Sequence, residues 1–282
     1  MLFRRVAIVG VGLIGGSLGA ALRDRKAAGE VRGIGYRTAT LEQAKQNGCV
    51  DTITVDLAEG VREADLVVIA TPVSLIAEKA RGLAAELPPR CIVTDVGSTK
   101  GKLARELDAI FAGKARYVGS HPMAGSEKHG AVSASKDLFN GALCILTPTA
   151  LTDADALRRM HEMWQTVGLR TCEMPPDEHD RRVALASHLL HVAAASIINV
   201  QNDASLQCAA SGFADTTRIA GSDPQLWRDI CLDNSREICA AIDKLCAELQ
   251  AFRSLVDRGD AQGLIDKLDR AAQKRRDWGN RR

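Results

Sequence analysis

A glycine-rich segment near the amino terminus has the composition of a dinucleotide-binding turn. The apolar run Arg5-Val6-Ala7-Ile8-Val9 leads directly into Gly10-Val11-Gly12-Leu13-Ile14-Gly15, and a helical pattern follows. In this context Gly10 permits the tight turn, Gly12 lets the backbone approach a pyrophosphate, and Gly15 lets the helix pack on the strand. The amino end of that helix would face the phosphates. A glycine-rich turn without a ligand is the less favoured alternative, so these six residues are predicted to bind a dinucleotide.

The position expected to contact the adenosine ribose carries a cation. Folds of this kind that bind NAD place an acidic residue about 20 residues beyond the turn, where it holds the ribose 2′-hydroxyl. This chain has Gly35-Tyr36-Arg37-Thr38 there. Because the Arg37 guanidinium could pair bidentately with a 2′-phosphate, with the Thr38 hydroxyl beside it, the pattern predicts NADP in preference to NAD. The alternatives are that Arg37 points to solvent and that NAD is also used.

Polar residues follow three further strand-like segments. Thr71 and Pro72 follow one buried apolar run, and the segment Asp95 to Lys100 follows another, so both loops are expected to border the cofactor. In the third, His121 is followed by a proline and a glycine-bearing loop, where a hydride-transfer site would lie. An isolated histidine is more often structural, but an unperturbed pKa of about 6.5 lets His121 accept a substrate hydroxyl proton near neutrality.

The elements that must position these residues alternate between strand and helix in the first half of the chain. This alternation is typical of a parallel sheet covered by helices, and it predicts a Rossmann-type, doubly wound α/β fold. The predicted strands are Arg5 to Val9, Val31 to Tyr36, Leu66 to Ala70, Cys91 to Val96, Tyr117 to Gly119 and Ala142 to Leu146. The predicted helices between them are Ser17 to Ala28, Thr40 to Asn47, Leu75 to Glu86 and Lys100 to Phe111.

The second half of the chain has helical spacing nearly throughout. The predicted helical segments are Arg181 to Asn202, Gln225 to Leu255 and Ala261 to Arg276, and Pro175-Pro176 is a plausible boundary before them. We therefore predict a dinucleotide-binding domain over residues 1–170 and an all-helical substrate and dimerisation domain over residues 171–282. The substrate is expected in the cleft between the two domains.

Composition excludes several classes of function. With 282 residues and a formal net charge of +2, the chain shows no bulk charge suited to nucleic acid, and its ten aromatic residues are too scattered to stack bases. Its eight cysteines form no C-x-x-C pair and are predicted to be buried, reduced thiols. No uninterrupted apolar run spans a membrane and no signal-peptide pattern follows Met1, so we expect a cytoplasmic enzyme without a membrane partner.

A series of segments spread along the chain matches one family. They are Gly10 to Gly15, Thr71-Pro72-Val73, Asp95 to Lys100, His121-Pro122-Met123-Ala124-Gly125-Ser126-Glu127-Lys128, Leu146 to Thr149, Ser187-His188-Leu189-Leu190-His191, Ser211 to Ala220, Ser222-Asp223-Pro224 and Trp227-Arg228-Asp229. With these segments the chain resembles the prephenate and arogenate dehydrogenases, the cyclohexadienyl dehydrogenases of tyrosine biosynthesis. The His121 and Ser211 segments are specific to that family. Leu190 departs from it, since proline often stands there.

The resemblance implies NAD(P)-dependent oxidative decarboxylation of a cyclohexadienyl acid. By motif match, His121 takes the proton of the ring hydroxyl while Ser98 hydrogen-bonds both groups. Arg218 matches the arginine that clamps a substrate carboxylate, and His191 matches the histidine of the helical domain at the substrate pocket. Ser126 and Glu127 match the loop that lines or gates the pocket.

The resemblance favours prephenate, with 4-hydroxyphenylpyruvate as product, and leaves arogenate or dual specificity as alternatives. A different NADP-linked hydroxyacid dehydrogenase and a non-catalytic dinucleotide sensor are remoter alternatives. His188 and His191 share a helix face without a third ligand, so no metal site is predicted. The surplus of apolar side chains in the helical half, together with the resemblance, predicts a homodimer through that half.

Overall fold

The computed structural model describes residues 1–125 and 130–280. The chain forms two compact units, residues 1–235 and residues 236–282. The first unit contains an eight-stranded sheet and most of the helices, and the second contains the last two helices. The boundary near residue 170 drawn from the sequence stays a prediction.

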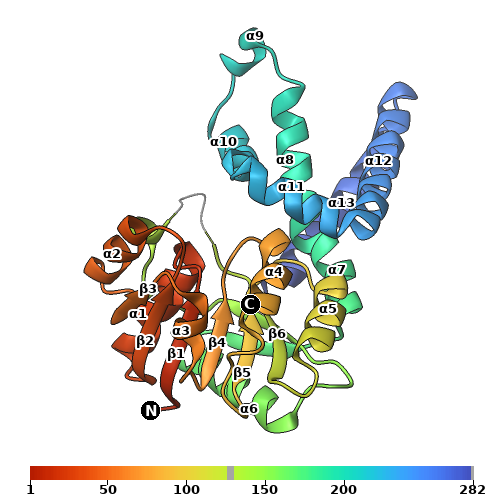
Figure 1. The fold of residues 1–282 in the computed structure, drawn as a ribbon. Coiled ribbons are helices and arrows are strands. Elements are labelled where there is room, and N and C mark those ends of the chain that lie inside the picture. Colours follow the sequence, from red (N-terminus) through yellow and green to blue (C-terminus); the bar gives the residue numbers. More distant parts are fainter. Residues whose placement is uncertain (126–129, 281–282) are drawn as a thin grey trace. The chain divides into compact units, whose positions relative to one another are not determined.

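The sheet has the order β3-β2-β1-β4-β5-β6-β7-β8 (Figure 1). Its strands are β1 (Phe3–Val9), β2 (Ala28–Ile34), β3 (Thr52–Thr54), β4 (Leu66–Ile69), β5 (Ile92–Asp95), β6 (Arg116–Pro122), β7 (Leu143–Thr147) and β8 (Arg170–Glu173). All neighbouring pairs are parallel except β6 with β7, which are antiparallel. The carboxyl ends of β1, β4, β5 and β6 therefore meet along one edge, where parallel sheets bind ligands.

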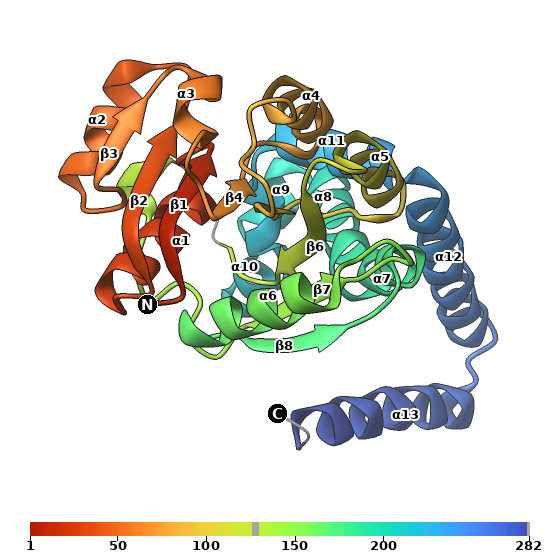
Figure 2. The same ribbon diagram turned by 60° about the horizontal axis from the view of Figure 1, so that its bottom comes forward.

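Helices cover both faces of the sheet, which confirms the predicted doubly wound fold (Figure 2). One core lies beneath α1 (Leu13–Asp24), α2 (Thr38–Gln46) and α6 (Ala154–Thr166), and the other beneath α3 (Leu57–Val61), α4 (Val73–Leu83) and α5 (Gly101–Phe111). Central strands such as β4, with the sequence Leu66-Val67-Val68-Ile69, are buried on both faces. Such uninterrupted apolar runs are what a sheet between two helical layers requires.

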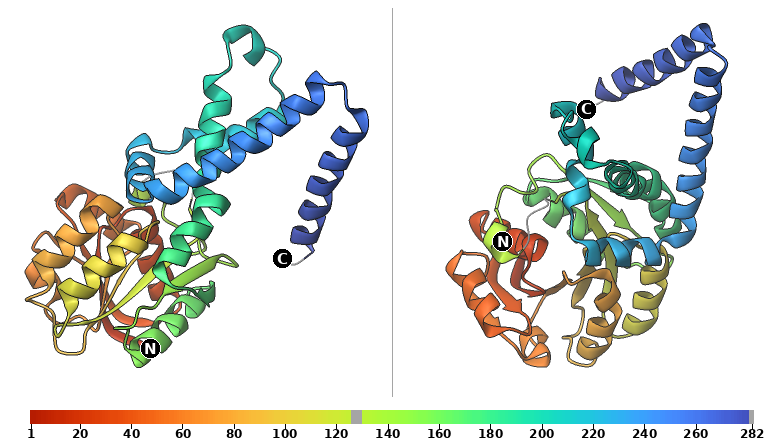
Figure 3. Two further views of the ribbon diagram at one scale, coloured as in Figure 1. Left: turned by 90° about the vertical axis from the view of Figure 1, so that its right-hand side faces the viewer. Right: turned by 90° about the horizontal axis from the view of Figure 1, so that it is seen from above.

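Helices follow the sheet from residue 176 onward. They are α7 (Pro176–Val183), the π-helical segment η2 (Ala184–His188), α8 (Leu189–Asn199), α9 (Asp203–Leu206), α10 (Ser211–Thr217), the 3-10 turn η3 (Arg218–Gly221) and α11 (Pro224–Asp233). The segments α7, η2 and α8 follow one another along a single rod (Figure 3). The second unit contains α13 (Ala261–Gly279) and all of α12 (Ser235–Asp257) except Ser235.

Several local predictions were wrong. The sequence patterns missed β3, β8, α3 and α6, and Ala28 begins β2 rather than ending a helix, because Lys26 has a positive φ of 52° after α1 has ended. The segment Gln225 to Leu255 is two helices, divided at Asn234. All eight cysteines are free, but only three are buried, and Cys208, Cys239 and Cys246 are exposed.

Candidate active site

A cavity of about 500 Å³ lies at the carboxyl edge of the sheet and is closed by the helices that follow it. Its sheet-side wall includes Gly12, Leu13, Ile14, Thr71, Pro72, Ser98 and His121, and its helical wall includes Ser187, His188, His191, Arg218, Asp223 and Trp227. All of these residues belong to the first unit. Glycines of the dinucleotide motif and polar side chains from several later segments therefore share one cavity.

The geometry of the glycine turn fits a dinucleotide. Gly10 has a φ of +96°, and a Cβ there would lie 2.7 Å from the carbonyl oxygen of Ala70, so no other residue fits. A Cβ on Gly15 would lie 2.2 Å from the Gly10 carbonyl oxygen. At Gly12, by contrast, a Cβ would meet no atom within 4 Å in the part of the chain that the structure describes. This open space lies before the amino end of α1, which has no side-chain cap and no acid in its first turn, so it suits a bound anion.

Thr71 adds a hydrogen-bonding group to the same wall. Its Oγ1 is buried and has no hydrogen-bond partner among the described residues. Since buried polar groups are nearly always paired in folded proteins, this hydroxyl marks a place for a ligand.

Arg37 lies just beyond the carboxyl end of β2 and precedes the first residue of α2, Thr38. Its guanidinium stacks 4.8 Å from the centre of the Tyr36 ring and donates to the Tyr36 hydroxyl, and Tyr36 itself is 82% exposed. The neighbouring β2 carbonyl of Ile34 accepts a hydrogen bond from Gly10, so Arg37 belongs to the same sheet edge as the glycine turn.

A chain of three buried polar side chains extends from the cavity into the protein. His121, at the carboxyl end of β6, is 7% exposed, and its Nδ1 lies 2.8 Å from His179 Nε2. His179 Nδ1 lies 2.8 Å from Asp180 Oδ1. Asp180 also accepts backbone hydrogen bonds from Lys100 and Gly101 at the start of α5, both at 2.7 Å. The helical rod is thereby tied to the loop that carries Ser98.

Burial determines the charge states along this chain. It lowers the pKa of His121 well below 6.5, and positive charge on His179, Lys100 or His188 would lower it further. Burial also lowers the pKa of His179, which hydrogen bonding to Asp180 partly opposes. Burial opposes ionisation of Asp180, but the hydrogen bonds from His179, Gly101 and Lys100 outweigh it, so the pKa of Asp180 is lowered. Both histidines are therefore neutral, and Asp180 is ionised, at neutral pH.

A buried ion pair supports the loop beside His121. The Lys100 ammonium and the Asp95 carboxylate are fully buried and form an ion pair, and Asp95 also accepts from Tyr117 Oη and from the backbone of Gly97 at 2.8 Å each. Breaking such a pair would leave an uncompensated buried charge, at a cost of about 3–5 kcal/mol. The segment from Asp95 to Gly101 is therefore fixed at both ends.

The helical wall presents two more histidines. His188 ends the π-helical segment, and its Nδ1 lies 3.2 Å from Asn234 Nδ2. The His191 ring stacks on Trp227 with centroids 3.5 Å apart. Burial lowers the pKa of each histidine to about 4, although the nearby Ile219 carbonyl opposes this shift at His191. Arg218, on η3, completes this wall and is exposed at its surface.

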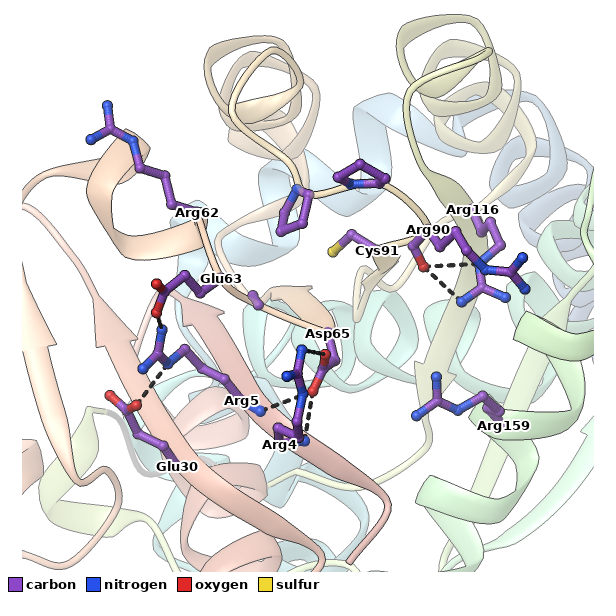
Figure 4. A pocket seen from close by; sticks show the side chains of 13 residues that line it. Arg4, Arg5, Glu30, Arg62, Glu63, Asp65, Arg90, Cys91, Arg116 and Arg159 are labelled. Atoms are coloured by element: carbon purple, nitrogen blue, oxygen red, sulfur yellow. Dashed lines mark hydrogen bonds and ion pairs between the residues drawn. The ribbon is translucent and has the colours of Figure 1, made fainter.

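A larger cavity, of about 620 Å³, lies at the opposite, amino-terminal edge of the sheet (Figure 4). Its arginines are Arg4, Arg5, Arg62, Arg90, Arg116 and Arg159. Several are neutralised by carboxylates: Arg5 by Glu30 and Glu63, and Arg4 by Asp65. It also lies away from the glycine turn, at the strand ends that parallel sheets seldom use for ligands. We therefore assign the functional site to the smaller cavity.

Comparison with known proteins agrees with this geometry. Residues 18–173 match the family described as "Prephenate dehydrogenase, nucleotide-binding domain", and residues 175–270 match "Prephenate dehydrogenase, dimerization domain". The chain belongs to the prephenate dehydrogenase family. It is an NAD(P)-dependent oxidoreductase of the prephenate and arogenate dehydrogenase class.

Curated relatives and solved structures cover most of the chain. Prephenate dehydrogenase of Bacillus subtilis is 34% identical, over 92% of this chain and 72% of the relative. Cyclohexadienyl dehydrogenase of Zymomonas mobilis is 32% identical, over 97% and 95%. The structure of A. aeolicus prephenate dehydrogenase with hydroxyphenyl propionate and NAD+ has 33% identity and a TM-score of 0.90, and it covers 97% of this chain and 98% of that one.

The structure brings most of the predicted site residues together. The lining of the cavity includes His121, Ser98, Arg218 and His191. Gly12, Leu13, Ile14, Thr71 and Pro72 also line it, whereas Gly10, Val11 and Gly15 shape the turn beneath. The hydrogen-bond partner of His121 Nδ1 is His179, so the contact expected from Ser98 stays a prediction. Ser126 and Glu127 lie outside the described residues.

Sequence reasoning missed His179, Asp180 and the pocket role of Trp227. An adjacent histidine and aspartate in the first turns of a helix after two prolines were a usable signal, but only the fold shows that they reach β6. Among residues 1–125 and 130–280, no group of three His, Cys, Asp or Glu side chains could hold a metal ion.

One helix, residues 176–199, is long and apolar enough to cross a membrane by length and composition. Its amino-terminal part, Pro176–Val183, is rich in charged residues, so the helix is not an uninterrupted apolar run. The same helix carries His179, Asp180, His188 and His191, so its polar side chains form part of the candidate active site. The compartment stays a prediction.

The glycine turn yields a paired test of cofactor binding. Gly12→Val should leave the melting temperature nearly unchanged, because a Cβ at this position would meet no atom of the described residues within 4 Å, and should weaken dinucleotide binding about tenfold or more. Gly15→Ala should instead destabilise the fold by about 1–3 kcal/mol, because its Cβ overlaps the Gly10 carbonyl. Thermal unfolding and cofactor titration measure the two effects. Unchanged dinucleotide affinity in Gly12→Val would place the phosphates elsewhere.

Proposed function

We propose that this chain oxidises and decarboxylates prephenate to 4-hydroxyphenylpyruvate, with His121 as the general base and NADP as the preferred cofactor. The observation that carries the proposal is the shared cavity, in which the glycine turn, His121 and the helical residues Arg218 and His191 converge. The bound nicotinamide supplies the hydride acceptor. The protein's own residues must bind the dianionic substrate, orient its ring hydroxyl and accept the hydroxyl proton.

His121 is suited to the proton-accepting role by its place and its charge state. It lies on β6, whose carboxyl end opens into the cavity, and its lowered pKa keeps it neutral at physiological pH. Ser98, in the loop after β5, lines the same cavity, where its hydroxyl would orient both the imidazole and the substrate hydroxyl. Loss of the ring carboxylate as CO₂ then makes the ring aromatic, which supplies most of the driving force.

Arg218 and His191 would recognise the carboxylates and the keto side chain. A guanidinium binds a carboxylate bidentately, and Arg218 is positioned by η3 on the helical wall. His191 is held against Trp227, so its ring can present a polar nitrogen in a fixed direction.

Prephenate is favoured over arogenate by the charges that line the described part of the cavity. The ammonium of arogenate would need a carboxylate, and the acid on the described wall is Asp223. Its Oδ1 already accepts from the backbone of Gln225 at 2.7 Å as the cap of α11. Glu127, the acid indicated by the sequence, lies outside the described residues.

The helical half exposes apolar side chains that suit a contact between subunits. The helix of residues 176–199 is strongly apolar, yet only 22% of its most apolar window is buried, and Leu190, Ile197 and Ile198 are exposed. An apolar helix face of this kind fits a contact with a second copy of the chain, and the match to a dimerization domain supports a homodimer.

Steady-state rates of NADPH or NADH formation test the substrate and the base together. We expect kcat/KM for prephenate to exceed that for arogenate by about tenfold or more, which corresponds to about 1.4 kcal/mol. His121→Ala should lower kcat by about 10²- to 10⁴-fold while cofactor affinity is retained. Preference for arogenate would reassign the substrate, and absence of turnover with both substrates and both cofactors would reject the enzyme.

Arg37→Asp should reverse the cofactor preference. Removing the guanidinium should lower kcat/KM for NADP by about 10- to 100-fold, because a charge-assisted pair to the 2′-phosphate is lost, while NAD use should improve. Arg236→Asp, at a side chain that is 95% exposed, is the matched control and should change neither. Native preference for NAD would contradict the assignment.

Ile198→Glu should convert the dimer to monomer at micromolar concentration, because a carboxylate would be buried without a partner in the subunit contact. Leu151→Glu, at a residue that is 71% exposed outside the helical half, is the control and should remain dimeric. Sedimentation velocity distinguishes the two, and a monomeric native protein would refute the dimer.

A further inference from the structure

The contacts behind His121 determine which of its nitrogens can accept a proton. Asp180 is ionised and can only accept, so the hydrogen between it and His179 must lie on His179 Nδ1. Neutral His179 then has a lone pair on Nε2, which requires a hydrogen on His121 Nδ1. Neutral His121 therefore carries its lone pair on Nε2. This tautomer is assigned from the hydrogen-bond network together with the charge states of Asp180 and the two histidines.

We propose that His179 and Asp180 form a proton relay behind His121, so that the charge created during catalysis leaves the cavity wall and comes to rest beside the Asp180 carboxylate. The inference rests on the proposed function, since it takes His121 as the base. His179 and Asp180 are not among the residues that line the cavity. Both are positioning residues that act through His121.

Each step of the relay conserves protons and charge. The substrate hydroxyl gives its proton to His121 Nε2, while His121 Nδ1 gives its own hydrogen to His179 Nε2. His121 is then neutral again in the opposite tautomer, and His179 is an imidazolium whose Nδ1 hydrogen remains bonded to Asp180. The oxidation itself passes the carbon-bound hydrogen, with its electron pair, to the cofactor of the reaction. After CO₂ has left, the phenolate oxygen takes the proton back, which resets both histidines.

The surrounding charges favour this transfer. A cation on His121 would be buried and would face Lys100 at the start of α5 and His188 on η2, with Cys144 of β7 as a neutral neighbour. A cation on His179 also faces Lys100, but it lies against Asp180 and within the field of Asp95 on β5. The transfer moves positive charge from a site without a carboxylate contact to one with a carboxylate at 2.8 Å.

The Asp180 carboxylate is held independently of the relay. Its two backbone hydrogen bonds come from Lys100 and Gly101, and a Cβ on Gly101 would lie 2.7 Å from Asp177 Oδ1 and 2.9 Å from Asp180 Oδ2, so any other residue would require these carboxylates to shift. The carboxylate thus stays in place whichever histidine carries the proton. A fixed charge needs no reorganisation during the reaction, which is the condition for effective electrostatic stabilisation.

His179→Gln separates positioning from proton acceptance. The Gln amide oxygen can still accept from His121 Nδ1, but it cannot take the proton. We expect kcat for prephenate to fall about tenfold or more with little change in KM or cofactor affinity. In a plot of kcat against pH, we also expect the acidic limb, where kcat falls as His121 becomes protonated, to move to lower pH. Without the relay, His121 is a weaker base. A purely structural defect would lower kcat without moving this limb.

His161→Gln is the matched control, because His161 also bridges a hydroxyl and a carboxylate, Thr171 and Glu173, but lies outside the cavity. It should change neither kcat nor the pH limb. Asp180→Asn provides a second variant should His179→Gln fold poorly, and it should shift the limb in the same direction. A limb that stays in place in the variants, or an unchanged kcat in His179→Gln, would overturn the relay.

Nitrogen-15 NMR of the imidazole rings gives a readout that does not depend on turnover. We expect His121 and His179 each to carry hydrogen on Nδ1 in the resting protein. Hydrogen on Nε2 of His121 would overturn the relay even in an active enzyme. If the native protein turns over neither prephenate nor arogenate while the tautomers are as expected, the failure lies in the proposed function.

Discussion

The carboxylate of Asp180 is the contact on which the site depends. It accepts three N–H groups from two directions, one from the neighbouring His179 ring and two from the backbone at the start of α5. The first turn of a helix has unpaired amides that need an acceptor, and here a side chain from another helix provides it. The same oxygen atoms therefore cap α5, orient His179 and join the helical rod to the sheet.

This arrangement explains how several charged side chains can be buried near the cavity. Lys100 has its backbone amide on Asp180 and its ammonium on Asp95, so one residue links both carboxylates. The loop between them carries Ser98, which is thereby held at the cavity wall. A network of this kind is costly unless every member is paired. Nearly all of its polar atoms are paired, which makes the loop a rigid part of the site.

The fold, the glycine turn and His121 could be predicted from local patterns in the sequence, whereas Ser98, Arg218 and His191 on the cavity wall were expected from the resemblance of their segments to one family. The glycine turn, the apolar strands and His121 after a strand are each visible within about ten residues. His179 could not be predicted in this way, because its contact with His121 spans 58 positions and depends on how the helical rod meets β6. The short edge strands β3 and β8, only three and four residues long, were missed because so few residues show no clear alternation. Asn234 was missed as a helix break because it is buried against Asp180 and His188 instead of lying in a polar loop.

The π-helical segment between α7 and α8 has a consequence for how this site could have arisen. A single π turn accommodates one more residue than the α-helix around it, so it is equivalent to a one-residue insertion absorbed within the helix. One residue added in α-helical geometry would rotate everything after it by about 100°, since each residue turns the helix by one part in about 3.6. His179 and Asp180 precede the π turn, whereas His191 follows it. The π turn absorbs the extra residue locally, so His191 keeps the phase it would have in an α-helix one residue shorter, and a one-residue deletion that turned the π segment into an α turn would leave both groups of polar residues facing their partners.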